Sequence, residues 1–170
     1  MTIELLIIAA FAALLVFLFV RGVALGYPKP PLDDSPLSRK EQAILAAAAD
    51  AFFPHGGAMP LSASEAGAVR YFSDLARDVP AKTRLLIKLL LHFVEHGPWV
   101  FNLSRRFTRQ TPQERVATLR SWQSHPIYFL RISFQSLRTL IAMAYMANDD
   151  VSARVHGTAP LASVREARAS

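Results

Sequence analysis

Residues 127–144 have the sequence IYFLRISFQSLRTLIAMA, and its pattern indicates the fold class of this protein. Its apolar residues recur at intervals of 3, 4, 3, 4 and 3 residues. They are Ile127, Leu130, Phe134, Leu137, Ile141 and Ala144. Because an α-helix places residues three and four apart on one face, this spacing predicts a helix whose apolar seam packs against other helices. No part of the sequence shows the sustained alternation of apolar and polar residues that is typical of strands.

Capping motifs and prolines divide the neighbouring sequence into further helices. Ser38–Glu41 and Ser62–Glu65 both have the S-x-x-E pattern of a capping box, and Thr111–Glu114 adds a proline at the first helical position. A leucine-rich helix is predicted to begin at Pro80 and to end at Gly97-Pro98. The sequence therefore predicts an all-α, bundle-like body of about five or six helices over residues 38–147.

A strongly apolar segment precedes this body. Residues 5–20 are sixteen consecutive apolar residues, LLIIAAFAALLVFLFV. A helix of about 20 apolar residues spans the hydrocarbon core of a bilayer, and Tyr27 lies where an interfacial aromatic residue is expected. We therefore predict a single transmembrane helix, the anchor, in residues 1–27.

The charges around the apolar segment predict its fate and its orientation. Only Glu4 precedes it, whereas a secretory signal peptide begins with basic residues, so an anchor is favoured over the alternative of a cleaved signal peptide. The cations that follow it are Arg21, Lys29, Arg39 and Lys40. Because basic flanks stay on the cytoplasmic side, we predict a single-pass protein of the cell (inner) membrane with a cytoplasmic body; a periplasmic body is the alternative.

Two segments without an apolar core flank the body. The sequence YPKPPLDDSP at residues 27–36 has four prolines in ten residues, which favour an extended chain. Residues 28–37 are therefore predicted to be a short, stiff spacer. From Asn148 onward the chain is polar, which predicts a tail without a core over residues 148–170.

The composition excludes several classes of function. The 170-residue chain has no cysteine, which rules out disulfides, thiolate zinc sites, iron–sulfur clusters and thioether-linked haem. Charged residues make up only 19%, compared with about 25% in soluble domains, so disorder of the whole chain is excluded and a membrane segment is expected. The sequence has no Gly-rich nucleotide-binding loop and no G-x-S-x-G elbow.

One pair of histidines could hold a cofactor. His92 and His96 are four residues apart in HFVEH and therefore share one helix face, a spacing that can bind a metal or a haem between helices. No second cluster of ligands accompanies them, and histidines near a helix C-terminus also interact favourably with the helix dipole. A haem or metal protein that uses this pair is one alternative, but we expect no catalytic residue, cofactor or metal in this chain.

Arginines and aromatic residues supply candidates for contact with a partner. Five arginines lie within the sixteen residues 105–120, without any nucleic-acid-binding motif, so we expect no nucleic acid. Anionic lipid, a partner protein or solvent can surround such side chains. The partner-interface candidates are Trp99, Arg105, Arg106, Trp122 and Arg131. Burial in the core is the alternative for both tryptophans.

The order of these motifs resembles a known family. The runs LSRKEQAILAAAADAFFP (residues 37–54) and SEAGAVRYFSDL (residues 64–75) are similar to the gluconate 2-dehydrogenase subunit 3 family. Residues 101–146 are similar to the helical region attached to long-chain alcohol oxidases. The first likeness depends on Leu37, Ser38, Glu41, Ala49-Asp50, Pro54, Glu65-Ala66-Gly67 and Val69. The second depends on Phe107, Arg115, Trp122, Ser124, Leu130-Arg131, Phe134, Leu137, Leu140 and Tyr145.

The resemblance implies that this chain works with a separate enzyme. The family's partner is a flavin-dependent oxidoreductase of the glucose–methanol–choline class, whose large subunit holds FAD and passes electrons to a cytochrome or a quinone. We therefore expect a membrane-anchored, non-catalytic small subunit that docks and stabilises an FAD-dependent alcohol or sugar dehydrogenase. A membrane-bound helical scaffold without a redox partner is the other alternative.

Overall fold

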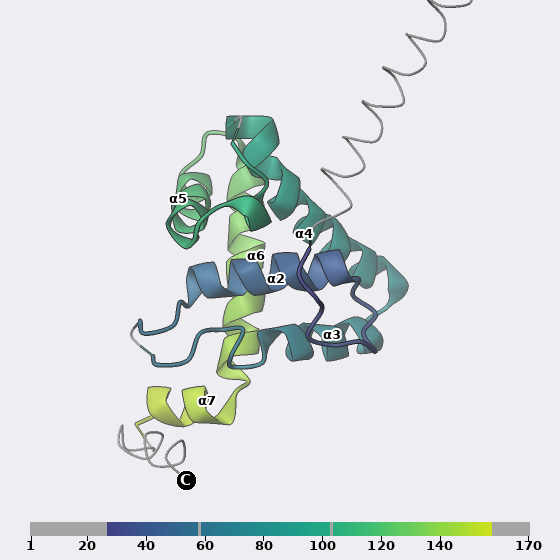
Figure 1. The fold of residues 1–170 in the computed structure, drawn as a ribbon, viewed down its shortest axis with the longest axis vertical. Coiled ribbons are helices and arrows are strands. Elements are labelled where there is room, and N and C mark those ends of the chain that lie inside the picture. Colours follow the sequence, from purple (N-terminus) through teal and green to yellow (C-terminus); the bar gives the residue numbers. More distant parts are fainter. Residues whose placement is uncertain (1–26, 58, 103, 158–170) are drawn as a thin grey trace, which may run out of the picture.

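The computed structural model describes residues 27–57, 59–102 and 104–157. Within these ranges the protein has six α-helices, one 3-10 helix and no strand, which confirms the all-α prediction (Figure 1). The elements are α2 (Arg39–Phe52), α3 (Ala68–Asp78), α4 (Ala81–Asn102), η1 (Phe107–Arg109), α5 (Pro112–Gln123), α6 (Tyr128–Met146) and α7 (Asp149–Val155). All of the predicted anchor except Tyr27 lies outside the described residues, and none of the described helices is long and apolar enough to cross a membrane.

Helix α2 is the centre of the body. It contacts α3, α4, α5, α6 and η1, and α6 runs steeply across α2 and α3 (Figure 1). Ile44, Leu45 and Ala48 are completely buried. Because the alanine side chains of AILAAAADA are short, neighbouring helices can approach α2 on several faces. The alanine-rich sequence of this helix therefore suits a central position in the body.

The apolar seam predicted from residues 127–144 faces the core, with one exception. Leu130, Phe134, Leu137, Ile141 and Ala144 are between 0% and 6% exposed, and this burial confirms the spacing argument. The exception is the first residue of the seam, which is the N-cap of α6 and is 43% exposed. The seam packs α6 against α2, α3 and α5.

Two of the three predicted capping boxes begin helices. At α2 and at α5 the N-cap oxygen accepts from the N3 amide while the N3 glutamate accepts from the N-cap amide. Ser62 and Glu65 make the same reciprocal hydrogen bonds, at 2.8 and 3.3 Å, but α3 begins only at Ala68. Gly67 has a φ of 90°. This left-handed conformation prevents a continuous helix from the turn at Ser62–Glu65 into α3.

Helix α4 does not end at Gly97-Pro98, as predicted, but continues to Asn102. Proline removes one backbone donor and disfavours a helix interior, yet tertiary packing holds the last turn in place. Gly97 lies directly against the indole ring of Trp122 on α5, and Ser104 closes the helix by donating its amide and its hydroxyl to the carbonyl of Pro98, at 3.2 and 3.1 Å.

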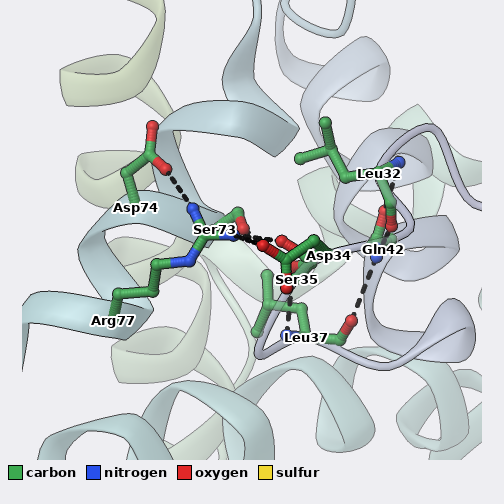
Figure 2. Close-up of polar contacts among 8 residues, drawn as sticks. All are labelled: Leu32, Asp34, Ser35, Leu37, Gln42, Ser73, Asp74 and Arg77. Carbon is green, nitrogen blue, oxygen red and sulfur yellow. Dashed lines mark hydrogen bonds and ion pairs between the residues drawn. The ribbon is translucent and has the colours of Figure 1, made fainter.

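The proline-rich segment is bound to the body and is not a free spacer. Residues 27–37, which we call the strap, contact α2 through Gln42, whose amide donates to the carbonyls of Leu32 and Leu37 at 2.9 and 3.0 Å. The side-chain oxygen of Gln42 in turn accepts from the amide of Leu32 (Figure 2). Ser73 of α3 donates to Ser35 at 2.8 Å. The bonds of Gln42 satisfy backbone groups of the strap, which has no regular secondary structure of its own.

Two arginine side chains and one lysine side chain form hydrogen bonds with three further carbonyl groups of the strap. Arg77 of α3 donates to the carbonyl of Asp34 (Figure 2), and Lys88 of α4 donates to the carbonyl of Pro36 at 2.8 Å. Arg39 of α2 donates to the carbonyl of Pro28 at 2.6 Å. The strap therefore holds its first residue, Tyr27, at a fixed position on the body.

Part of the predicted polar tail is helical. Asn148 caps α7 by accepting from the amide of Val151 at 3.1 Å, and its own amide donates to the carbonyl of Ala66. Val151 is completely buried. One valine on a short capped helix thus extends the core, which corrects the expectation of a tail without a core; residues 158–170 lie outside the described part of the chain.

Candidate functional site

The most prominent surface feature is an apolar area on the outer sides of α4 and of the first turns of α6. Its side chains are large and between 39% and 64% exposed. They are Leu85, Leu86, Leu89, Trp99, Val100, Phe101, Phe129 and Ile132. We call this area the α4–α6 surface.

Phe93 joins the two parts of the α4–α6 surface. Its ring lies 6.0 Å from the ring of Phe101 and 4.8 Å from that of Phe129, both in edge-to-face geometry. On its inner side the same ring lies 5.3 Å from the ring of Trp122. Leu86, Leu89 and Phe93 follow helical spacing, so the apolar stripe of α4 is continuous with the aromatic cluster at its C-terminal end.

This exposure follows from a helix that is apolar on two sides. Ile87, Leu91 and Val94 point into the core and are at most 7% exposed, whereas Leu85 and Leu86 point outward. A helix that buries one face in a soluble monomer carries polar residues on the other. Soluble monomers rarely expose contiguous apolar areas of more than a few hundred Å², so such an area indicates a binding surface. The leucine-rich sequence of α4 was the feature from which this binding surface could have been predicted.

The structure separates the five interface candidates. Trp99 is 58% exposed and belongs to the α4–α6 surface, and Arg105 is also exposed. Trp122 is completely buried and offers no atom to a partner, which removes it from the interface candidates. Arg131 donates to the carbonyls of His125 and Pro126, at 2.6 and 2.9 Å, and so fastens the turn between α5 and α6.

Arg106, the fifth candidate, belongs to a buried polar network around Glu95. Glu95 has no exposed surface, and its carboxylate accepts from the hydroxyl of Tyr27 at 2.9 Å and from the hydroxyl and amide of Thr108 at 2.7 and 3.0 Å. The guanidinium of Arg106 lies 3.6 Å from the same carboxylate and donates to the Tyr27 hydroxyl at 3.1 Å. A buried carboxylate needs such partners, because desolvation of an unpaired charge is costly.

The Glu95 network joins three segments that are distant in the sequence. Tyr27 belongs to the strap and Glu95 to α4. Thr108 belongs to η1, and Arg106 is the residue before η1. Tyr27 is only 6% exposed and its ring is covered by the guanidinium of Arg106 at 5.0 Å, so protein contacts hold its side chain. The network therefore fixes Tyr27, the first described residue, against the body.

The two histidines lie beside this network. His96 Nε2 is 3.0 Å from the ammonium of Lys40, which can only donate, so this ring nitrogen accepts and carries no proton. His92 Nε2 lies 3.6 Å from the carboxylate of Glu41. Burial, followed by the positive charge of Lys40, lowers the pKa of both histidines. In the described part of the chain no group of three or more potential metal ligands is found.

The lowered histidine pKa values predict a pH dependence of stability. Lys40, Glu41, Glu95 and Arg106 face the two rings from α2, α4 and the segment before η1, and the net effect disfavours the imidazolium. The unfolded chain, with histidine pKa values of about 6.5, then binds more protons than the folded chain. The two histidines therefore leave the free energy of unfolding unchanged above about pH 7. They lower it progressively as the pH falls below about 6.5, where the unfolded chain takes up protons.

Chemical denaturation at several pH values measures this effect. The double variant His92→Gln/His96→Gln is expected to have a flatter profile between about pH 5 and 7. His156→Gln, at an exposed position after α7, is the control and keeps the wild-type slope. Greater stability of the wild-type chain on acidification would contradict the sign derived above.

Sequence patterns alone missed Glu95, Tyr27 and Thr108 as members of one network. A single carboxylate within the apolar run LLLHFVEHGPWV was the available signal, since a charged residue on a core-facing side needs partners. Its partners are 68 and 13 residues away in the sequence, and no local motif connects them.

No model of a known protein family matches this chain. No curated protein and no solved structure matches it either. Its function is therefore inferred from the α4–α6 surface and the strap, together with the resemblance in its sequence.

Proposed function

We propose that this protein is a membrane-anchored, non-catalytic small subunit that docks and stabilises a separate FAD-dependent alcohol or sugar dehydrogenase of the glucose–methanol–choline class. The observation that carries the proposal is the α4–α6 surface, whose Trp99, Phe101 and Phe129 are 39–58% exposed. Tryptophan and other aromatic residues dominate the binding energy of protein interfaces when a partner desolvates them. The resemblance to gluconate 2-dehydrogenase subunit 3 supplies the class of the partner.

The mechanism of such a subunit is thermodynamic. A chain that binds only the folded large subunit stabilises it by RT ln(1 + [L]/Kd), which is about 2.7 kcal/mol at a hundredfold excess over Kd. FAD and the reacting alcohol belong to the large subunit, and a cytochrome or quinone would accept the electrons. An anchor in residues 1–27, joined to the body by the strap, would hold the enzyme close to acceptors dissolved in the membrane.

Co-purification of a flavoprotein with the full chain from detergent extracts tests the proposal. Trp99→Glu/Phe129→Glu places two charges in the α4–α6 surface, and we expect the affinity for the dehydrogenase to fall by about 100-fold or more, because each such position contributes about 2 kcal/mol in a desolvated interface. The measurement is the flavin absorbance that co-elutes with the chain.

Met143→Glu/Val155→Glu is the matched control. Both residues are apolar and 53% and 52% exposed, but they lie outside the α4–α6 surface, so this variant is expected to retain the flavoprotein. Equal thermal stability of the two double variants shows that the charges act at the interface and not on the fold. A wild-type chain that elutes alone, beside a dehydrogenase that is fully active without it, would contradict the proposal.

A further inference from the structure

A hollow lies between the strap and helix α2. It has a volume of about 290 Å³ and is bounded by residues 28–31, by the outer face of α2 from Arg39 to Asp50, and by Thr108 and Arg115. Its size is at the lower end of the range for small-ligand pockets. We call it the strap groove.

The strap groove is positively charged. Lys29, Arg39 and Arg115 line it, and Asp50 is the one acidic lining residue. Asp50 is already engaged, because its two carboxylate oxygens accept from the hydroxyl and amide of Ser64 at 2.8 and 3.0 Å. None of the ion pairs found among the described residues involves the three lining cations.

These cations still have donors for an anion. Arg39 uses Nε for the carbonyl of Pro28, and Arg115 uses Nε and one terminal nitrogen for the carbonyls of Phe107 and Thr108. Within the described part of the chain, both terminal nitrogens of Arg39 and the ammonium of Lys29 make no hydrogen bond. Guanidinium and ammonium groups in this arrangement suit a phosphate group.

The position of the groove indicates where the anion comes from. Its lining begins at Pro28, directly after Tyr27, which the Glu95 network holds against the body. Residues 1–26 precede this point and include the sixteen apolar residues predicted to enter the bilayer. Only residues 21–26 separate Val20, the last of these apolar residues, from Tyr27. Even a fully extended chain of this length reaches at most about 25 Å, so the groove would lie close to the headgroup layer, where basic residues near the surface attract anionic lipid.

We propose that the strap groove binds the headgroup of an anionic phospholipid and so sets the orientation of the body on the membrane. This inference rests on the membrane-anchored part of the proposed function and not on the identity of the partner. Lys29 and Arg39 contact the phosphate, and Arg115 supplies positive charge at the far side of the groove. The strap joins the groove to Tyr27, and Tyr27 is hydrogen-bonded to Glu95 of α4. A headgroup in the groove would therefore fix the position of α4, and of the α4–α6 surface, relative to the membrane.

Thermal unfolding of the full chain in detergent micelles tests the groove. Addition of phosphatidylglycerol is expected to raise the unfolding temperature by roughly 3–6 °C more than the same amount of phosphatidylcholine, as for a ligand at about tenfold excess over Kd. Lys29→Gln/Arg39→Gln is expected to lose most of this difference. Lys82→Gln/Arg120→Gln removes the same charge from exposed positions outside the groove and is expected to keep it.

The possible outcomes separate this inference from the proposed function. Equal effects of the two lipids on the wild-type chain, or an equal loss in both double variants, would overturn the inference. An equal rise with inorganic phosphate would also overturn it, since the groove would then bind a soluble anion. A chain that responds to phosphatidylglycerol but retains no flavoprotein contradicts the proposed function alone.

Discussion

Glu95→Ala is expected to lower the free energy of unfolding by about 3–5 kcal/mol, the usual cost of removing one member of a buried ion pair. The variant leaves Arg106, which is 14% exposed, without its carboxylate. It also removes the acceptor of the Tyr27 hydroxyl and of both donors of Thr108. The loss therefore combines a largely buried cation without its carboxylate with donors that have lost an acceptor.

Urea denaturation of the full chain in a mild detergent, followed by tryptophan fluorescence, measures this loss. Glu95→Gln keeps the size of the side chain and one acceptor oxygen, so we expect a smaller decrease of roughly 1–3 kcal/mol. Asp78→Ala removes an exposed carboxylate and is expected to change the free energy of unfolding by less than about 0.5 kcal/mol. If Glu95→Ala were as stable as Asp78→Ala, the network would not hold the strap.

Gly97→Ala is expected to destabilise the protein although alanine is the better helix former. A Cβ at this position would lie 2.7 and 2.8 Å from two atoms of the Trp122 ring, which is completely buried and could shift only by disturbing its packing against Phe93. Overpacking of this kind costs about 1–3 kcal/mol, more than the advantage of up to about 1 kcal/mol that alanine has over glycine in a helix. We therefore expect a net decrease in the free energy of unfolding.

A double-mutant cycle with Trp122→Phe separates this clash from other effects. The phenylalanine ring lacks the atoms that the new Cβ would meet, so Gly97→Ala should cost less in the Trp122→Phe background, by about 1 kcal/mol or more. Urea denaturation followed by far-UV circular dichroism, whose signal does not depend on Trp122, measures all four proteins. Strictly additive effects would show that the approach of the indole ring to α4 is not what requires glycine.

Binding of a partner to the α4–α6 surface is also expected to depend on the Glu95 network and on the contact between Gly97 and Trp122. The Glu95 network and the Gly97–Trp122 contact set how the C-terminal turns of α4 sit on the body, and these turns carry Trp99, Val100 and Phe101. Variants of Glu95 or Gly97 would thus reduce binding to a partner through a disturbed surface, whereas Trp99→Glu/Phe129→Glu acts on the surface itself. Comparison of binding with thermal stability distinguishes the two effects.

Much of the secondary structure could be predicted from the sequence because its signals are local. The capping boxes at Ser38 and Thr111 and the seam of α6 each depend on residues within four positions of one another, which an α-helix brings together by itself. These signals also predicted the all-α class. The capping box at Ser62–Glu65 did not predict the start of α3 correctly, because Gly67, five residues after the capping serine, has a left-handed backbone conformation that ends the turn before the helix begins.

The functional surfaces depended on the tertiary structure. Trp99 and Trp122 both lie on helices, yet Trp99 is exposed, whereas Trp122 is buried against Gly97 and Phe93 of a neighbouring helix. The sequence of the strap predicts a spacer. The strap is part of the body because Gln42, on the next helix, and Glu95, which is 68 residues from Tyr27, form hydrogen bonds with it. Local signals located the starts of α2 and α5 and the buried face of α6, because these features depend on neighbours along the chain. They did not predict the start of α3, the last turn of α4 or helix α7. The side of each helix that is covered and the side that is left for a partner were decided by contacts between segments as far as 68 residues apart.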